Sequence, residues 1–267
     1  MLELLRYPFM TNALLAGILV AAAAGPCGYI LVARNLTFAG HALPSIGFAG
    51  AAGAVLAGVQ PVYGLLAFSV AAGVGVGIAG EDLRERDIGV GIVMTLALGL
   101  GLLFLSLYSG YAQRIYAVLF GSILGISATA VRLTAAGALF VLAAFAALYR
   151  PLLFSTFDPA SARARGVPVR LLSVLFMIMV SVVISIAVQV MGALLVFTLL
   201  VGPAATLSRL VHRPSAAILG SVALGIAYVT VGILLAAASN RLPVSFFVAS
   251  VSFAVYLPVR LATPQEA

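Results

Sequence analysis

The chain has few charged side chains, no lysine and one cysteine, and each shortage excludes a class of protein. Only 8% of its 267 residues are charged, whereas soluble domains have roughly a quarter, so the sequence has no room for a sizeable domain outside a membrane. A single cysteine, Cys27, excludes an internal disulfide and a cysteine-rich metal site. Because Cys27 lies inside an apolar run, we expect it to pack as a small hydrophobic residue.

Motifs that carry chemistry are also absent. The sequence has no GxxxxGK[ST] loop, so the chain cannot hydrolyse ATP by a P-loop mechanism, and no HExxH motif that would support an intramembrane hydrolase. No Asp, Glu or Lys lies in the middle of an apolar run, which disfavours a proton-coupled transporter. The sequence therefore predicts no catalytic or cofactor-binding residue, and a partner must supply any driving energy.

Long apolar runs fill the chain, and 64% of its residues are hydrophobic. About 20 apolar residues in a helix cross a bilayer, and each crossing must be helical because no water is present to pair the backbone. The sequence thus predicts one domain over residues 1–267, an all-α polytopic membrane protein with eight or nine transmembrane helices. The possible spans are residues 10–33, 43–58, 61–80, 88–108, 130–149, 171–189, 192–208, 215–238 and 243–259. Residues 115–127 are too short to cross and are interpreted as a re-entrant helix.

The fourteen arginines predict the orientation of these spans. On a soluble protein, a net charge of +7 would suggest nucleic acid; here the arginines lie at helix ends, so lipid contact is favoured and no nucleic acid partner is expected. Ten fall on one side, namely Arg34, Arg84, Arg86, Arg150, Arg163, Arg165, Arg170, Arg209, Arg213 and Arg260. Four fall on the other, namely Arg6, Arg114, Arg132 and Arg241. The positive-inside rule then puts the C-terminus in the cytoplasm and the N-terminus outside.

The longest polar connection, residues 150–170, is predicted to hold a short cytoplasmic helix. Asp158 is a good helix N-cap, Pro159 suits the first helical position, and Gly166 can end the helix. Two arginines, Arg163 and Arg165, would face water or lipid head groups. An ordinary interfacial turn would explain such a helix, but its length and its clear start and stop signals favour a docking element.

His41 lies where a membrane helix is expected to begin, next to Gly40 and Pro44. An ionisable residue at membrane depth is a candidate functional residue, and neutral imidazole is a common ligand for zinc or manganese. Ser45, four residues further on, would share its helix face. The alternative is a helix-end histidine that is hydrogen-bonded to the backbone.

A second interruption, Gly202–Pro203, lies in an otherwise apolar span. Proline removes a backbone hydrogen bond and allows a kink, and the Thr206 hydroxyl can satisfy a freed carbonyl. Two membrane segments interrupted by Gly and Pro indicate a permeation path, unless these residues serve only in helix packing.

Four stretches resemble, in the same order, the ABC-3 family of membrane subunits of ABC importers for divalent metals. They are LVARNLTFAGHAL, DIGVGIVMT at Asp87–Thr95, FDPASARARGV at Phe157–Val167 and GALLVFTLLVGPAAT at Gly192–Thr206. The resemblance implies a homodimer in the bacterial cytoplasmic membrane, separate cytoplasmic ATPase subunits that use ATP, an extracytoplasmic metal-binding protein, and a divalent metal as substrate. It also implies that Asp158–Gly166 is a coupling helix for the ATPase, with the residues Asp158, Pro159, Ala162, Arg163, Arg165 and Gly166.

The metal-gating stretch of the family often reads Gly-Asp-Ala-Leu-Ser-His or Gly-His-Ala-Leu-Ser-His. Here it reads Gly40-His41-Ala42-Leu43-Pro44-Ser45, so His41 matches the first polar position and Ser45 replaces the second ligand. Two copies of His41 could still face each other in a dimer. This departure leaves the metal open, as well as whether the substrate is a metal at all. A stand-alone secondary transporter or channel, or a membrane scaffold without a substrate, remains an alternative.

Overall fold

The computed structural model describes residues 8–79, 83–108, 126–239 and 244–263, and the described residues form ten helices and no strand. The helices are α1 (Pro8–Ala33), α2 (Thr37–Leu56), α3 (Pro61–Ile78), α4 (Leu83–Leu107), α6 (Ala128–Phe157), α7 (Pro159–Ala164), α8 (Val169–Met191), α9 (Ala193–Leu210), α10 (Pro214–Ser239) and α11 (Val244–Ala262). Eight of them are long and apolar enough to span a membrane, and α9 carries a shorter apolar stretch, Leu195–Leu210. The predicted all-α polytopic membrane protein is confirmed.

Two helix boundaries lie more than five residues from the predicted ones, and each of these helices contains a proline. Helix α2 begins at Thr37 instead of residue 43, and α6 continues to Phe157 instead of ending at residue 149. Pro44 and Pro151 lie inside these helices. A proline removes only one backbone hydrogen bond, and packed neighbours allow a membrane helix to continue through it.

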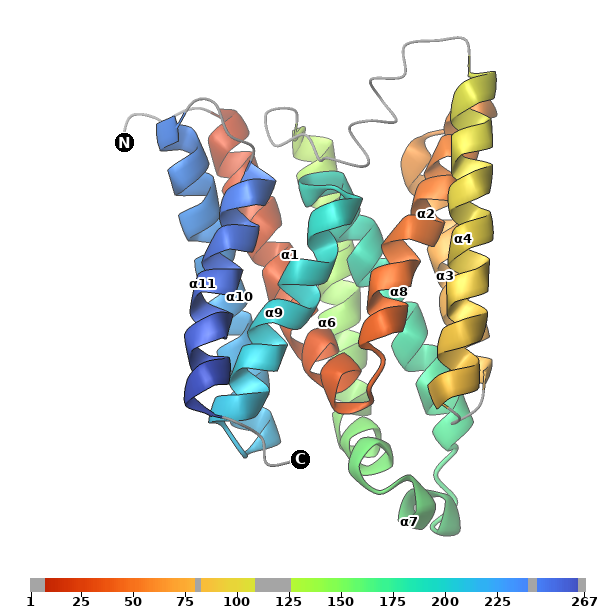
Figure 1. Cartoon of the computed structure of the whole chain (residues 1–267), viewed down its shortest axis with the longest axis vertical. Helices are drawn as coiled ribbons and strands as arrows, with labels where there is room; N and C mark the ends of the chain where they lie inside the picture. Colours follow the sequence, from red (N-terminus) through yellow and green to blue (C-terminus); the bar gives the residue numbers. More distant parts are fainter. Residues whose placement is uncertain (1–7, 80–82, 109–125, 240–243, 264–267) are drawn as a thin grey trace.

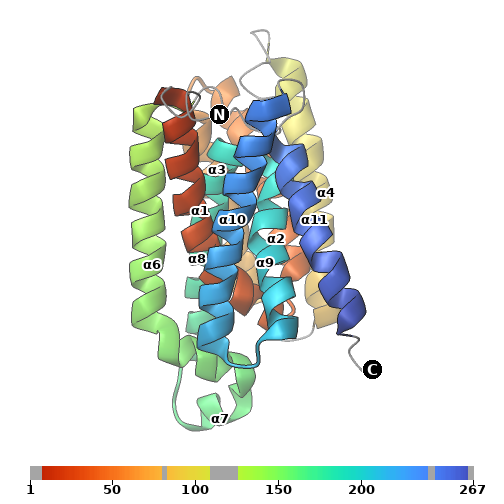
Figure 2. The same cartoon turned by 90° about the vertical axis from the view of Figure 1, so that its left-hand side faces the viewer.

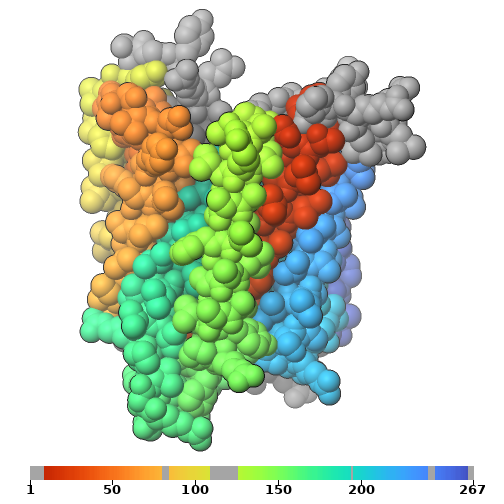
Figure 3. Space-filling view, turned by 180° about the vertical axis from the view of Figure 1, so that it is seen from behind, coloured from red at the N-terminus to blue at the C-terminus, as the bar shows by residue number. Residues whose placement is uncertain are grey.

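The helices form an elongated bundle, and consecutive helices alternate in direction (Figure 1). Helices α1, α2 and α8 are largely buried, whereas α3, α4, α6 and α11 lie at the periphery. Figure 2 shows α6, α1, α10 and α11 side by side, and from behind α6 crosses the face between α3 and α10 (Figure 3). The core contains fully buried side chains from most of the long helices, among them Leu31, Leu43, Phe176 and Leu199.

Glycine allows a close helix contact between α2 and α3. A Cβ atom at Gly50 would meet the carbonyl oxygen of Gly64, and one at Gly64 would meet the carbonyl oxygen of Gly50. Because backbone atoms cannot rotate away, both positions need glycine for the helices to approach. The two backbones therefore meet directly, six residues after Pro44 in α2.

The predicted re-entrant helix at residues 115–127 lies outside the described residues, apart from Ile126 and Ser127. Ser127 caps α6 by accepting a hydrogen bond from the backbone N–H of Ala130 at 3.2 Å. Helix α4 ends, and α6 begins, at the same end of the bundle (Figure 1). Helix α1 begins at that end too, whereas α7 and the end of α11 lie at the opposite end.

Candidate functional site

Helix α7 projects beyond the other helices at one end of the bundle (Figures 1 and 2). The Asp158 carboxylate accepts a hydrogen bond from the Ser161 N–H at 3.0 Å, and Pro159 is the first helical residue. Gly166 follows the helix at φ +77°, in the left-handed region that favours glycine. The predicted short helix is therefore present, while its coupling role remains a prediction.

Some side chains of α7 pack against the bundle, and others are exposed. Ala162 is fully buried and attaches the helix to the bundle, and the Arg165 guanidinium lies 5.5 Å from the centre of the Phe154 ring on α6. Arg163 is exposed. Hydrogen bonds from Ser161, with a smaller effect of Arg165, hold the pKa of Asp158 below its usual range, so the cap is charged at neutral pH.

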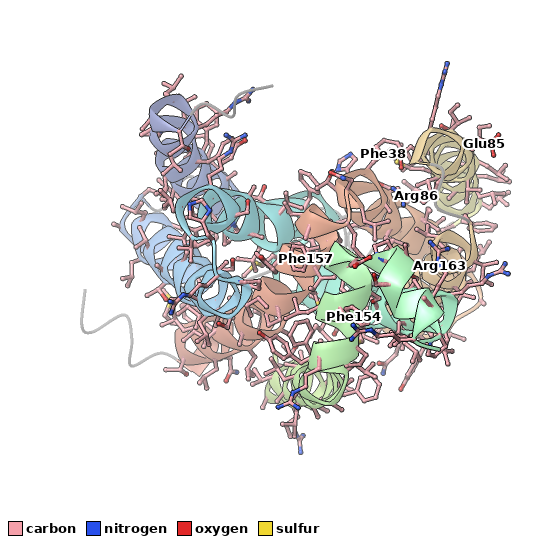
Figure 4. The ribbon with its side chains drawn as sticks, turned by 90° about the horizontal axis from the view of Figure 1, so that it is seen from below. Phe38, Glu85, Arg86, Phe154, Phe157 and Arg163 are labelled. Atoms are coloured by element: carbon pink, nitrogen blue, oxygen red, sulfur yellow. The ribbon has the colours of Figure 1, made fainter. Side chains whose placement is uncertain are left out.

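Aromatic and charged residues gather at the end of the bundle that carries α7. Figure 4 looks onto this end and labels residues from α2, α4, α6 and α7, namely Phe38, Glu85, Arg86, Phe154, Phe157 and Arg163. The Phe157 side chain is exposed. Glu85 and Arg163 are exposed too, whereas Arg86 is buried. An end that exposes an aromatic ring as well as charged groups is suited to contact with another protein.

His41 lies in the second turn of α2, because this helix begins before it at Thr37. Its side chain is exposed, and Ser45 is half-buried one turn further on. The imidazole packs edge-on against the ring of Phe197 on α9, with 5.2 Å between ring centres and 80° between the planes. The structure thus brings together the two interrupted segments that the sequence singled out. Phe197 was missed because an aromatic residue in an apolar run has no distinguishing signal.

Gly202 and Pro203 lie inside α9, but they face other helices. A Cβ atom at Gly202 would meet the Ser252 hydroxyl on α11, and Pro203 is buried. The Thr206 hydroxyl donates to the Gly202 carbonyl at 2.8 Å. The expectation that it satisfies a freed carbonyl is therefore not met, because Pro203 frees the carbonyl of Leu199, four residues before it.

Within the described ranges, no group of three or more His, Cys, Asp or Glu side chains is placed to hold a metal ion. His41 with Ser45 is the candidate donor pair of this part of the chain, and it supplies one imidazole and one hydroxyl. Two donors leave most positions around a divalent cation to water or to another molecule. Such a pair is suited to a weak, transient contact.

Arg34 at the end of α1 is the residue whose contacts sequence reasoning missed. The sequence marked it only as a positive charge that orients the first span. In the structure its guanidinium is hydrogen-bonded to α6 and α8, on both sides of α7. Residues more than one hundred positions away supply these contacts, so no local pattern could reveal them.

The fold and these features define a polytopic helical permease with a short helix that projects from one end. Residues 6–262 match the model of the ABC 3 transport family, and the chain belongs to this family. As a permease subunit it is not an enzyme, as the sequence predicted.

Several known proteins are similar to this chain. It is 32% identical over 212 residues to a "Manganese transport system membrane protein MntC" of Halalkalibacterium halodurans, an alignment covering 79% of this chain and 73% of the relative. Identity to the protein of the same description from Listeria innocua is 28% over 230 residues, covering 86% and 82%. The solved structure "PsaBC from Streptococcus pneumoniae in complex with Fab" is 24% identical, with a TM-score of 0.86 over 98% of this chain and 94% of that one. The last match supports the fold.

Proposed function

We propose that this chain is the membrane permease of an ATP-driven importer for a divalent metal ion, with manganese favoured over zinc. The observation that carries the proposal is the family match over residues 6–262, together with relatives described as manganese transport proteins. Manganese prefers oxygen ligands and water, which agrees with a path that offers one imidazole beside a hydroxyl. Zinc prefers imidazole, so both metals belong in the test.

The translocation path runs between two copies of the chain, in our proposal, and is lined by α2 and α9. Two observations support this placement. The His41 side chain is exposed in a single chain, and it contacts Phe197 on α9. One copy offers too few ligands to hold a metal, whereas a homodimer doubles the set. Weak ligands suit a path, because it must release what it binds.

Helix α7 is the proposed contact with a separate ATPase subunit in the cytoplasm. Its projection beyond the bundle, its two caps and the exposed Phe157 and Arg163 support this role. The end that carries α7 then faces the cytoplasm of a bacterial inner membrane, together with the C-terminal end of α11, as the arginine distribution predicts. An extracytoplasmic binding protein delivers the metal at the opposite end. Rigid-body movement of the spans, driven by ATP, alternates access to the path.

Uptake by the reconstituted complex tests this proposal. The permease, its ATPase and its binding protein are placed in liposomes, and ATP-dependent uptake of manganese and of zinc is measured. We expect His41→Ala to reduce uptake about tenfold or more, since loss of even a second-shell partner of a metal typically costs this much. His212→Ala is the matched control, because it changes the other histidine, exposed between α9 and α10. Equal uptake by both variants would remove His41 from the path, and an absence of metal uptake by the wild type would refute the function.

A further inference from the structure

Arg34 makes an unusually complete set of contacts for an arginine at the end of a membrane helix. Its Nε donates to the Thr156 hydroxyl at 2.9 Å, and its Nη2 donates to the Ser155 hydroxyl at 2.8 Å and to the Leu152 carbonyl at 3.4 Å. Its Nη1 donates to the Ser173 hydroxyl at 3.1 Å. The guanidinium therefore uses all three nitrogens in hydrogen bonds.

The position of these partners along the chain is informative. Ser155 and Thr156 belong to the last turn of α6, immediately before α7, and Ser173 belongs to the start of α8, immediately after it. Both supports of α7 are thus hydrogen-bonded to one side chain of α1. The Arg34 guanidinium also lies 5.4 Å from the ring centre of Phe176, which is fully buried on α8.

The residues that follow Arg34 in the chain connect it to α2, which lines the candidate path. The chain turns sharply at Asn35, with φ +53°, and the Leu36 N–H donates to the Leu31 carbonyl at 2.9 Å before α2 begins. Arg86 at the start of α4 donates to the Asn35 carbonyl at 3.0 Å. His41 follows Arg34 by seven residues, and α2 already begins between them, at Thr37. The corner between α1 and α2 is therefore held from α4, α6 and α8.

The physical chemistry makes this corner rigid. The Arg34 partners in the described part of the chain are hydroxyls, a carbonyl and an aromatic ring, so the cation is held by a planar fork of hydrogen bonds. The carbonyl end of α6 adds a favourable field for a positive charge. Burial lowers the pKa of Arg34 to about 10, so it stays charged at neutral pH. Pulling such a cation away from its partners is costly, and we expect the corner to move together with the ends of α6 and α8.

We propose that Arg34 is the positioning residue that transmits movement of α7 to His41 on α2. The inference rests on the proposed function, because it assumes that an ATPase moves α7. In this arrangement a shift of α7 carries the ends of α6 and α8 with it. The guanidinium then carries the corner between α1 and α2, and the corner rotates the first turns of α2. Removing the Arg34 guanidinium would leave α7 and the start of α2 intact, and it would break the connection between them.

The test measures metal uptake and ATP hydrolysis in the same liposomes. We expect Arg34→Gln to reduce the metal transported per ATP about tenfold while ATP hydrolysis persists, within the range that mutations along coupling networks produce. Arg34→Lys keeps the charge but cannot reproduce the planar fork, so it should remain partly uncoupled. Arg150→Gln is the matched control, because it removes an exposed arginine of α6 outside this cluster. The metal transported per ATP by Arg150→Gln should stay at the wild-type value.

A second, milder variant tests the proposal even if Arg34→Gln does not fold. Ser173→Ala removes only the hydrogen bond to α8 and should lower the ratio about threefold. The proposal is overturned if uptake and ATP hydrolysis fall in the same proportion, which indicates a role in assembly, if Arg34→Lys is fully coupled, or if Ser173→Ala keeps the wild-type ratio.

Thiol labelling separates this inference from the proposed function. His41→Cys is introduced together with Cys27→Ala, and its rate of reaction with a water-soluble methanethiosulfonate is compared in the complex with and without ATP. We expect an ATP-dependent change in rate that Arg34→Gln abolishes and Arg150→Gln keeps. If the wild-type complex transports no metal but the His41→Cys, Cys27→Ala protein shows this labelling pattern, the function is refuted and the connection is supported. An ATP-dependent change that survives Arg34→Gln, or no such change in the His41→Cys, Cys27→Ala protein that keeps Arg34, refutes the connection.

Discussion

Replacement of Gly77 by alanine tests the packing that places α8 beside α3. A Cβ atom at this position would lie 2.6 Å from the Cα of Val174 and 3.0 Å from its backbone nitrogen. Ordinary contact begins at 3.4 Å, so the two helices must separate by about 0.8 Å. Backbone atoms cannot rotate away, and overpacking of this kind typically costs about 1–3 kcal/mol.

Gly75→Ala is the matched control on the same helix. A Cβ atom at Gly75 would meet nothing within 4 Å, because this residue borders a groove of about 830 Å³ between α3 and α4. Both replacements exchange glycine for alanine in the last turn of α3, where the gain in helix propensity is at most about 1 kcal/mol. This gain cancels in the comparison, so the difference between the two variants measures the overpacking at Val174.

Thermal unfolding of the purified chain in detergent, followed by size-exclusion chromatography, is the assay. At about 2–4 °C per kcal/mol, a cost of about 1–3 kcal/mol should place the Tm of Gly77→Ala about 2–12 °C below that of Gly75→Ala. Equal Tm values for the two variants would show that α3 and α8 do not pack as closely as described, and would refute the reasoning.

Four further predictions concern Asp158, Ser161, Ser181 and Cys27. Asp158→Ala should reduce metal uptake at an unchanged level of chain in the membrane, whereas Asp158→Asn, which keeps an N-cap, should retain it. Because Ser161 lowers the pKa of Asp158, the charged cap is present at neutral pH and is lost as the pH falls through this lowered pKa. Protection of the Ser161 amide against hydrogen exchange should therefore decline below about pH 4, and a constant protection would contradict the cap. Ser181→Ala removes the hydrogen bonds to the carbonyls of Ser69 and Met177 and should lower the free energy of unfolding by about 1 kcal/mol, measured in the same Tm assay. Cys27 is fully buried and should resist maleimide until the chain unfolds; rapid labelling of the native chain would contradict this burial.

The helices could be predicted because the bilayer imposes a length and a composition on each crossing. Nine expected spans correspond to nine of the helices in the described ranges. The errors arose at Pro44 and Pro151, where a helix continues through a residue that usually ends one. Local sequence signals the lost hydrogen bond, whereas the neighbouring helices that compensate for it come from distant parts of the chain.

In the candidate site, too, features set by local sequence could be predicted and contacts between distant residues could not. Helix α7 could be predicted because its cap, its first proline and its terminal glycine lie within nine consecutive residues. The contact of His41 with Phe197, and the cluster around Arg34, could not be predicted. The hydrogen-bond partners of Arg34 lie 118 to 139 residues away in the chain.

Sequence by itself determined that this is a polytopic helical membrane protein, where its helices lie, and that a capped helix interrupts residues 150–170, because apolar run length and capping are local properties. Only the tertiary structure decided that one guanidinium joins both supports of α7 to the helix that carries His41. Side-chain contacts between helices depend on how the whole bundle packs, and no local pattern contains that information.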